Sequence, residues 1–337
     1  MPVSPEYEAK VLELYDVALL LNYERGTTEP RFRHTKLREI ATPGTNFRTV
    51  KIMAPEWTEA AVPRTGLVFD RQKPPSDQTE EPDLSENILP EPVPHILQNL
   101  TPRDLETYYW QARNHDGCFS TVTLFQHFID LLQDEYIRIR VRTVDGKNTR
   151  VYTTLASDRL IVEMELFEPK HLTASIVIPD NQTYITGADA RSLHAVLGFA
   201  SPGAKLDTIL DLSALQFGSD AGRGGPKNHD LFVLEPIARY DARLLKFATG
   251  NTFREAKLSG RIRDNAPNNA WLLEVAQRAK DRWDNRENVP WCGHCGAPPR
   301  GGQDLKKCSK CKNAYYCNAE HQAWAWPFHK HFCDETK

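Results

Sequence analysis

The chain has 337 residues, 40% of them hydrophobic and 26% charged, and a formal net charge of −3. This length and composition are ordinary for a globular protein of two or three domains. No apolar run approaches the ~20 residues that a membrane-spanning helix needs, and the charge balance gives no reason to expect nucleic-acid binding.

The N-terminal part predicts one helix. Apolar side chains recur at helical spacing from Glu6 to Tyr23, which predicts an amphipathic helix closed by Arg25-Gly26. The stretch from His34 to Phe69 is mixed and rich in turn residues, with one short β-like run at Arg48 to Met53. We therefore expect residues 1–70 to be a helix and a mixed segment packed on the main domain.

Residues 71–97 differ in composition from the chain before them. Six prolines alternate with acidic residues between Arg71 and Pro94. Such a segment cannot bury enough apolar surface to offset the entropy lost on ordering it. We therefore expect a proline- and acid-rich linker or a long surface loop.

Residues 98–285 predict an α+β domain built on a largely antiparallel sheet with helices. Thr101 is expected to cap a helix that has proline at its first position and ends near Arg113. A buried helix follows from Phe119, and then the period of the apolar residues changes to two. Strands are expected at Tyr136–Val141, Arg150–Leu155, Leu160–Phe167, Thr173–Ile178, Gln182–Ile185, Leu193–Phe199 and Asp207–Leu212, with a hairpin turn at Asp145-Gly146.

Two more segments complete this domain. Ser219 to Asn228 is rich in glycine but lacks the Gly-Lys-Ser/Thr pattern of a phosphate-binding loop, so we expect a flexible loop. Asn268 to Trp283 has apolar residues at helical spacing and predicts a last amphipathic helix.

Six of the seven cysteines lie in the last 46 residues, and their spacing predicts metal binding. Eight cysteine and histidine side chains form four pairs: Cys292/Cys295, Cys308/Cys311, Cys317/His321 and His329/Cys333. Two-residue gaps suit a knuckle around one ion, and three-residue gaps place both ligands on one helix face. Eight ligands are enough for two tetrahedral zinc ions.

Two alternatives to zinc fit less well. Disulfides would require an oxidising compartment, and the polar start MPVSPEYEAK does not resemble a secretory signal. An iron–sulfur cluster held by cysteines would not call for two histidines at helical spacing. We therefore expect two structural zinc ions and a reducing compartment, the cytoplasm or the nucleus.

The segment 291–333 resembles a MYND-type zinc finger. The resemblance rests on the paired knuckles, Tyr316-Cys317, Trp326-Pro327, His329-Lys330 and a final Cys333. In that family the ligands interleave, which implies one zinc at Cys292, Cys295, Cys317 and His321 and a second at Cys308, Cys311, His329 and Cys333. The family usually has cysteine where this chain has His321, and histidine ligates zinc equally well. His294, between two ligands, is expected to be exposed.

The resemblance implies a module that binds proteins, with short proline-containing peptides among its ligands. The stretch from Ile88 to Ile96 could serve as a ligand within the same chain, although a plain linker explains it as well. The aromatic side chains that are candidates for partner contact are Trp324, Trp326 and Phe328, and at least one of them is expected to pack in the small core of the finger.

A second group of candidate site residues includes Cys118, the cysteine outside the finger. It follows Gly117 at the predicted start of a helix, where the helix dipole and free N–H groups favour a thiolate. This placement, followed by His194 and Asp211 on later strands, resembles transglutaminase-like and papain-like folds. The resemblance implies that Cys118 attacks a carbonyl, His194 holds its proton and Asp211 orients the imidazole.

The same residues have ordinary explanations. A lone cysteine is commonly a small buried hydrophobe, and Leu193 to Leu197 could be helical, which would direct His194 elsewhere. His115 is a competing partner for the thiol, and a tryptophan often found after the family's histidine is absent, with Ala195-Val196 in its place. An inactive scaffold is therefore the simpler hypothesis.

The sequence leads to three hypotheses on function. The first is an adaptor or recruitment protein that binds protein partners through its zinc finger, and the second is a cysteine-dependent hydrolase or acyltransferase. A SET-domain methyltransferase, another host of MYND fingers, is disfavoured because no Asn-His-Ser-like motif or glycine-rich cofactor segment is present.

Overall fold

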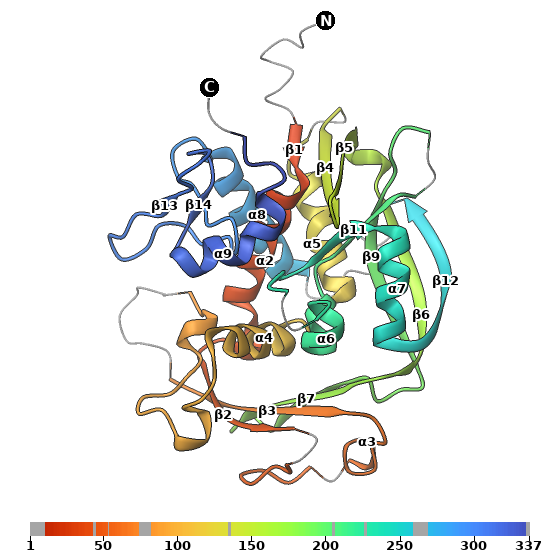
Figure 1. Ribbon diagram of the computed structural model, residues 1–337. Helices are drawn as coiled ribbons and strands as arrows, with labels where there is room; N and C mark the ends of the chain where they lie inside the picture. Colours follow the sequence, from red (N-terminus) through yellow and green to blue (C-terminus); the bar gives the residue numbers. More distant parts are fainter. Residues whose placement is uncertain are drawn as a thin grey trace, which may run out of the picture.

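The computed structural model describes residues 11–42, 45–52, 54–73, 82–133, 136–203, 206–225, 228–258 and 269–334. The predicted class, α+β with largely antiparallel sheets and a small C-terminal finger, is confirmed (Figure 1). None of the helices in these ranges is both long and apolar enough to cross a membrane.

Helix α2 (Leu14–Thr28) is the centre of the core and follows the short strand β1 (Val11–Glu13). The predicted amphipathic helix is therefore a nearly buried one, because neighbours cover it on all sides from Val17 to Thr27. It also runs past the predicted end at Arg25-Gly26. Arg25, 1% exposed, donates to the carbonyl of Arg113 at 3.0 Å, which compensates its buried charge.

A five-stranded antiparallel sheet carries the later chemistry, in the order β11-β10-β9-β6-β12. The predicted alternation of apolar residues corresponds to β6 (Leu160–Pro169), β9 (Arg191–Phe199) and β10 (Thr208–Asp211). Strands β11 (Val233–Pro236) and β12 (Ala248–Leu258), joined by helix α7 (Ile237–Phe247), complete it.

A second sheet combines the N-terminal segment with the main domain. Its order is β2-β3-β7-β8, from β2 (Thr35–Ala41), β3 (Arg64–Arg71), β7 (Leu172–Ile178) and β8 (Gln182–Thr186). Strands β3 and β7 pair in parallel. The strand predicted at Arg48 to Met53 is wrong for the described residues 48–52, because Arg48 and Thr49 instead donate their N–H groups to the carboxylate of Glu39.

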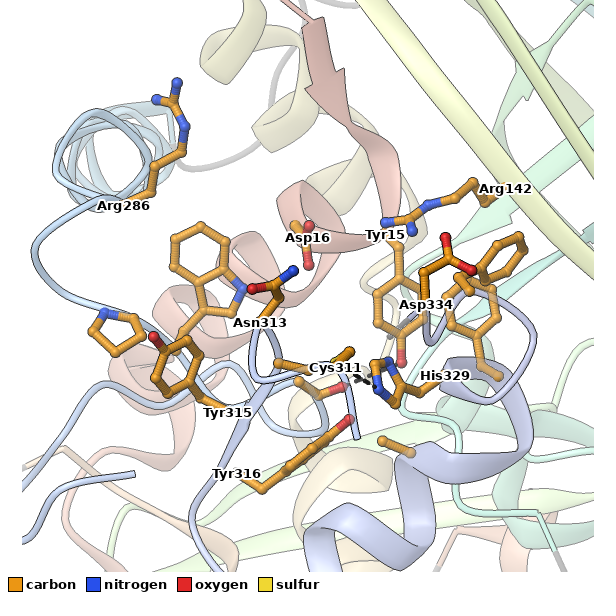
Figure 2. A pocket seen from close by; sticks show the side chains of 17 residues that line it. Tyr15, Asp16, Arg142, Arg286, Cys311, Asn313, Tyr315, Tyr316, His329 and Asp334 are labelled. Atoms are coloured by element: carbon orange, nitrogen blue, oxygen red, sulfur yellow. Dashed lines mark hydrogen bonds between the residues drawn. The ribbon is translucent and has the colours of Figure 1, made fainter. Parts of the chain in front are cut away.

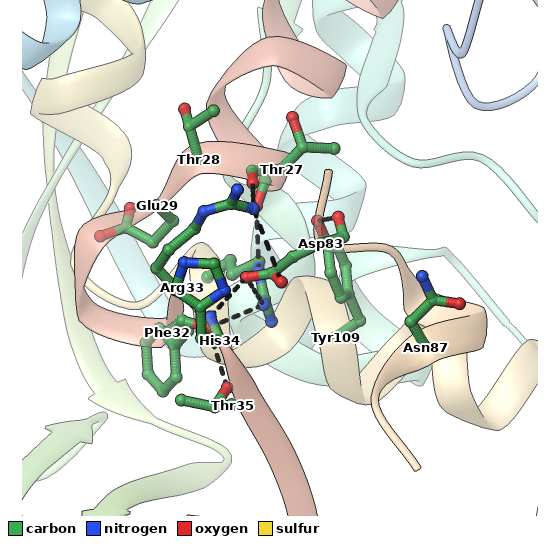
Figure 3. A network of polar contacts seen from close by, with 12 residues as sticks. Thr27, Thr28, Glu29, Phe32, Arg33, His34, Thr35, Asp83, Asn87 and Tyr109 are labelled. Atoms are coloured by element: carbon green, nitrogen blue, oxygen red, sulfur yellow. Dashed lines mark hydrogen bonds and ion pairs between the residues drawn. The ribbon is translucent and has the colours of Figure 1, made fainter. Parts of the chain in front are cut away.

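The second half of the predicted linker is an ordered strap. Asp83 accepts a hydrogen bond from the N–H of His34 at 2.9 Å and pairs with Arg33 at 3.5 Å and Arg113 at 3.6 Å (Figure 3). Two short 3₁₀ turns, Ser85–Asn87 and His95–Leu97, follow. Ile88, 1% exposed, packs in the main core, so it is not free to act as a ligand of the finger. Residues 74–81 lie outside the described ranges.

The helices of the main domain begin where the sequence predicts. Helix α4 (Pro102–Arg113) has a capping box in which Thr101 and Asp104 satisfy each other's backbone N–H groups. Helix α5 (Cys118–Asp130) follows, and α8 (Asn269–Asp284) packs on both α2 and α5. The predicted hairpin is β4 (Arg138–Asp145) and β5 (Asn148–Leu155), and β4 also pairs in parallel with β1.

Four short elements fill the connections: α3 (Pro55–Thr58), η4 (Ala156–Asp158), η5 (Ala214–Phe217) and α6 (Gly218–Gly222). The glycine-rich segment predicted as a flexible loop thus starts inside helix α6. Its Arg223 is fully buried and donates to Glu106 at 2.8 Å, so this part of the loop is fixed.

Candidate metal centres and a buried thiol site

Two clusters of cysteine and histidine form in the finger, with the predicted membership. Cys292, Cys295, Cys317 and His321 make the first, and Cys308, Cys311, His329 and Cys333 make the second, with all ligand atoms of a cluster within 4.8 Å of one another. The Sγ atoms of Cys295 and Cys317 are 3.7 Å apart, and those of Cys308 and Cys333 are 3.8 Å apart. A tetrahedron with zinc–sulfur bonds of about 2.3 Å has edges of about 3.8 Å, so the clusters fit two zinc ions.

Local structure places these ligands. The hairpin of β13 (Lys306–Lys307) and β14 (Tyr315–Tyr316) brings the Cys308/Cys311 knuckle next to Cys317. Helix α9 (Ala319–His329) starts at Asn318, whose side chain accepts from the N–H of His321 at 2.8 Å. That cap fixes the start of the helix that carries His321 and His329, one ligand of each cluster.

The finger docks on the main domain by stacking aromatic rings. Phe328 of α9 stacks on Tyr15 of α2 with ring centroids 4.2 Å apart, and Trp324 stacks on His229 at 4.6 Å. Of the three aromatic residues expected to meet partners, these two are therefore used within the chain. Trp326 alone of the three is exposed, at 40%.

Gly296 lets the first knuckle approach helix α2 closely. Its φ of +76° disfavours any residue with a side chain, and a Cβ there would lie 2.6 Å from the carbonyl oxygen of Leu19.

His294 is buried, 3% exposed, although its position between two ligands predicted an exposed residue. Its Nε2 lies 2.9 Å from a carboxylate oxygen of Glu106 in α4, whose other oxygen accepts from Arg223. Burial alone would raise the pKa of Glu106, but His294 and Arg223 lower it to about 2. This chain of polar contacts joins the first zinc knuckle to the main domain, and no sequence signal marks Glu106 as its partner.

A groove of about 460 Å³ lies where the finger meets α2 (Figure 2). Arg142, Arg286, Asp16 and Asp334 supply charged groups of both signs along it. Aromatic side chains dominate the walls: Tyr15, Trp291, Tyr315, Tyr316, Phe328 and Phe332. Such a surface is typical of the grooves that bind extended or proline-containing peptides.

The structure brings Cys118, His194 and Asp211 together. Cys118 is the first residue of α5 and is 5% exposed. His194 lies on β9 opposite Met164, in a strand rather than a helix, and it lines the same cavity as Cys118, whose Sγ donates to the carbonyl of Leu193 at 3.9 Å. Its Nε2 is 2.9 Å from Oδ2 of Asp211, the last residue of β10. Since Nε2 is occupied, Nδ1 is the ring nitrogen left for the thiol.

Asp211 is held by several donors. Its Oδ1 accepts from the N–H of Ser213 at 2.9 Å and from the Ser213 hydroxyl at 3.0 Å, and Tyr240 donates to its Oδ2 at 2.9 Å. Burial alone would raise the pKa of Asp211, but His194, Ser213 and Tyr240 lower it. Tyr240 was missed from the sequence, because it lies 29 residues beyond Asp211, on α7.

The electrostatics of His194 favour its protonated form. Burial would lower the pKa of the imidazole, but the charge and hydrogen bond of Asp211, together with Cys118, raise it to about 10. A protonated histidine between a carboxylate and a thiol stabilises a thiolate on the other side.

Cys118 and His194 line a cavity of about 270 Å³. Phe119, Leu166, Pro169, Ile185 and Phe217 supply apolar walls, and Gln216 lies beside them. His115, the competing partner for the thiol, points elsewhere: its Nδ1 contacts the Thr186 hydroxyl and its Nε2 lies 3.1 Å from Asp116. The cavity gives a substrate-sized space next to the sulfur.

Comparison with known proteins identifies the finger. The family model described as "MYND finger" matches residues 292–333. The chain is 36% identical over 69 residues to N-lysine methyltransferase SMYD2 of Bos taurus, covering 20% of this chain and 13% of that protein. It is 49% identical over 41 residues to N-lysine methyltransferase SMYD2-A of Danio rerio, covering 12% of this chain and 9% of that protein.

The chain therefore spans only a small part of the length of these relatives. No solved structure matches it. The C-terminal segment is a MYND finger with two zinc sites. The resemblance of the central domain to transglutaminase-like folds is not confirmed by these comparisons.

Proposed function

We propose that this protein is a thiol-dependent enzyme of acyl transfer or hydrolysis, to which a MYND finger is attached for binding protein partners. The observation that carries the proposal is the position of His194, which lines one cavity with Cys118 and lies 2.9 Å from Asp211. A nucleophile, a base and an orienting acid in that order are the arrangement that activates a cysteine for attack on a carbonyl.

The reaction would proceed in two steps. The Cys118 thiolate attacks the carbonyl carbon, a carbon–sulfur bond forms, and His194 gives its proton to the departing amine, alcohol or thiol. Water or an amine then attacks the thioester, His194 takes the proton of that nucleophile, and the Cys118 thiolate leaves. Asp211 keeps the imidazole in the tautomer that both steps need.

The start of helix α5 suits the oxyanion that each step creates. The first N–H groups of a helix have no acceptor within the helix, and the helix dipole favours negative charge there. In α5 the first backbone hydrogen bond runs from the N–H of Thr121 to the carbonyl of Gly117. The N–H groups of Cys118 and Phe119 come before it in the chain and therefore have no acceptor within the helix. These groups flank the sulfur and would stabilise charge on the carbonyl oxygen.

Iodoacetamide labelling of the zinc-loaded protein tests whether Cys118 is a nucleophile. We expect peptide mass spectrometry to show Cys118 alkylated at least tenfold faster than in a His194→Ala variant, because the thiolate is lost with the imidazolium. Equal rates in the two proteins, both folded, would mean that the cluster is an inactive scaffold.

A second candidate function, recruitment of a partner, is favoured by the aromatic groove beside the finger. MYND fingers generally mediate protein–protein interaction, and the groove suits a proline-containing peptide. The reduced thiols of the finger and of Cys118 support a cytoplasmic or nuclear location. The names of the relatives specify lysine methyltransferases. Because the matches cover so little of their lengths, we do not propose methyl transfer for this chain.

Fluorescence titration with a labelled proline-rich peptide tests the recruitment function. Tyr315→Ala, in the groove wall, is expected to weaken binding by about 1–2 kcal/mol. Trp326→Ala, on the exposed face of α9 outside the groove, is the matched aromatic control. A loss caused only by Trp326→Ala would place the contact on α9, and no loss with either would remove the finger as a peptide-binding site.

A further inference from the structure

The cavity that holds Cys118 has a negatively charged lining. Among its described lining residues the formal charges besides the His194 imidazole are the carboxylates of Asp116 and Asp189, and neither lysine nor arginine lines it. Asp189 is exposed in the loop between β8 and β9, so it stands at the cavity's opening.

Asp116 is held in place two residues before the nucleophile. Its φ of +47° is a left-handed conformation that is uncommon outside glycine, so surrounding contacts must fix it. His115, 3% exposed, supplies one contact at 3.1 Å, and Arg31 in turn donates to the carbonyl of His115 at 2.9 Å. Burial alone would raise the pKa of Asp116, but His115 and Arg31 hold it below its usual value, so this carboxylate is ionised at neutral pH.

The neighbouring cavity has the opposite charge. It has a volume of about 360 Å³ and shares Phe217 with the Cys118 cavity. Arg103, Lys170 and Lys246 line it, with Asp104 as the carboxylate. The sign of the charge thus changes across Phe217, and an anionic group finds its favourable surroundings away from the sulfur.

We infer that the Cys118 cavity selects acyl substrates that carry a positive charge next to the reactive carbonyl, such as a peptide with a lysine or arginine side chain. Asp116 and Asp189 are the specificity-determining residues. The inference rests on the proposed acyl transfer at Cys118. Its physical basis is that two carboxylates at a cavity lined by neither lysine nor arginine attract a cation and repel an anion.

The test compares thioesters of N-acetyl-lysine, N-acetyl-norleucine and N-acetyl-glutamate, which differ in side-chain charge. We expect kcat/KM to fall roughly tenfold from lysine to norleucine and again from norleucine to glutamate. Asp189→Asn and Asp116→Asn should each reduce the lysine-to-glutamate ratio severalfold. Asp158→Asn, an exposed carboxylate on η4 away from the cavity, is the matched control and should leave the ratio unchanged.

A second measurement reads the charge preference without turnover. Methanethiosulfonates with a 2-aminoethyl, a methyl or a 2-sulfonatoethyl group form a disulfide with a thiolate and release methanesulfinate. The rates at Cys118 are mapped by mass spectrometry and divided by those of free N-acetylcysteine. These ratios should fall from the 2-aminoethyl to the methyl to the 2-sulfonatoethyl reagent, and Asp189→Asn should reduce the difference.

The two proposals fail in different ways. If the aspartate variants turn thioesters over rapidly with the same charge preference as wild type, the selectivity assigned to Asp116 and Asp189 is overturned. The proposed acyl transfer at Cys118 would still stand. Absence of turnover with every thioester would overturn the acyl transfer, and the thiosulfonate rates would then decide the selectivity alone.

Discussion

Replacement of Asp211 by asparagine is expected to slow acyl transfer from Cys118 by about 10²–10⁴-fold. The amide oxygen can still accept from Ser213, which keeps the side chain in place, but the NH2 group then stands where Oδ2 accepts from Tyr240, so the side chain no longer stabilises the imidazolium of His194. Pre-steady-state release of p-nitrophenol from p-nitrophenyl acetate measures the acylation step. Tyr240→Phe, which removes one donor to Asp211, is the control and should cost about tenfold. Equal acylation by Asp211→Asn and wild type would contradict the role given to Asp211.

The free energy of unfolding should depend on pH differently in wild type and in Asp211→Asn. The pKa of His194 is raised from 6.5 to about 10 by Asp211 and Cys118 against the effect of burial. The resulting stabilisation is fully present below about pH 6.5 and is lost as the pH rises through about 10. Urea unfolding between pH 6 and 10 should show a decline in wild type that is much smaller in Asp211→Asn.

Removal of zinc is expected to unfold the finger and to weaken the rest of the protein. Structural zinc contributes on the order of 10 kcal/mol per site to folding in small zinc modules. Cys317→Ser removes a ligand of the first site, and the protein should then retain less than two zinc ions. The disturbance should spread, because His294, between Cys292 and Cys295 of that site, is the buried hydrogen-bond partner of Glu106, and a buried polar group left without its partner costs about 1–3 kcal/mol.

Zinc analysis and amide hydrogen exchange measure both parts of this prediction. Helix α4 should exchange faster in Cys317→Ser, since it carries Glu106. Cys118→Ser, a cysteine replacement outside the finger, should keep two zinc ions and wild-type exchange in α4. Unchanged exchange in α4 after zinc loss would show that the finger contributes nothing to the main domain.

The parts that the sequence predicted well rest on short-range patterns. The short gap within each pair of zinc ligands, the Thr101 cap and the alternation of β6 and β9 are all set within about ten residues. The order of Cys118, His194 and Asp211, which resembles that of transglutaminase-like folds, also suggested them as partners. The structure places His194 2.9 Å from Asp211 and on the same cavity as Cys118.

The parts that were missed depend on contacts between distant residues. Glu106 and His294 are 188 residues apart. The amphipathic pattern in α2 did not reveal that the finger, α4 and α8 cover its remaining face. Strands β2 and β3 lie in a segment too mixed for a clear period; pairing with β7 stabilises β3, and pairing with β3 stabilises β2. The acidic, proline-rich composition around residue 83 predicted a linker or a long surface loop. It did not reveal the ordered strap, because the arginines that bind Asp83 come from other segments.

Intact-mass spectrometry during reaction with p-nitrophenyl acetate tests the thiol chemistry most directly. The account predicts that the zinc-loaded protein gains one acetyl group, that the group maps to Cys118, and that it disappears again as the thioester is hydrolysed. Cys118→Ser with both zinc sites filled should not gain it. Acetylation that never reaches Cys118, or that is the same in Cys118→Ser, would contradict a catalytic thiol at this site.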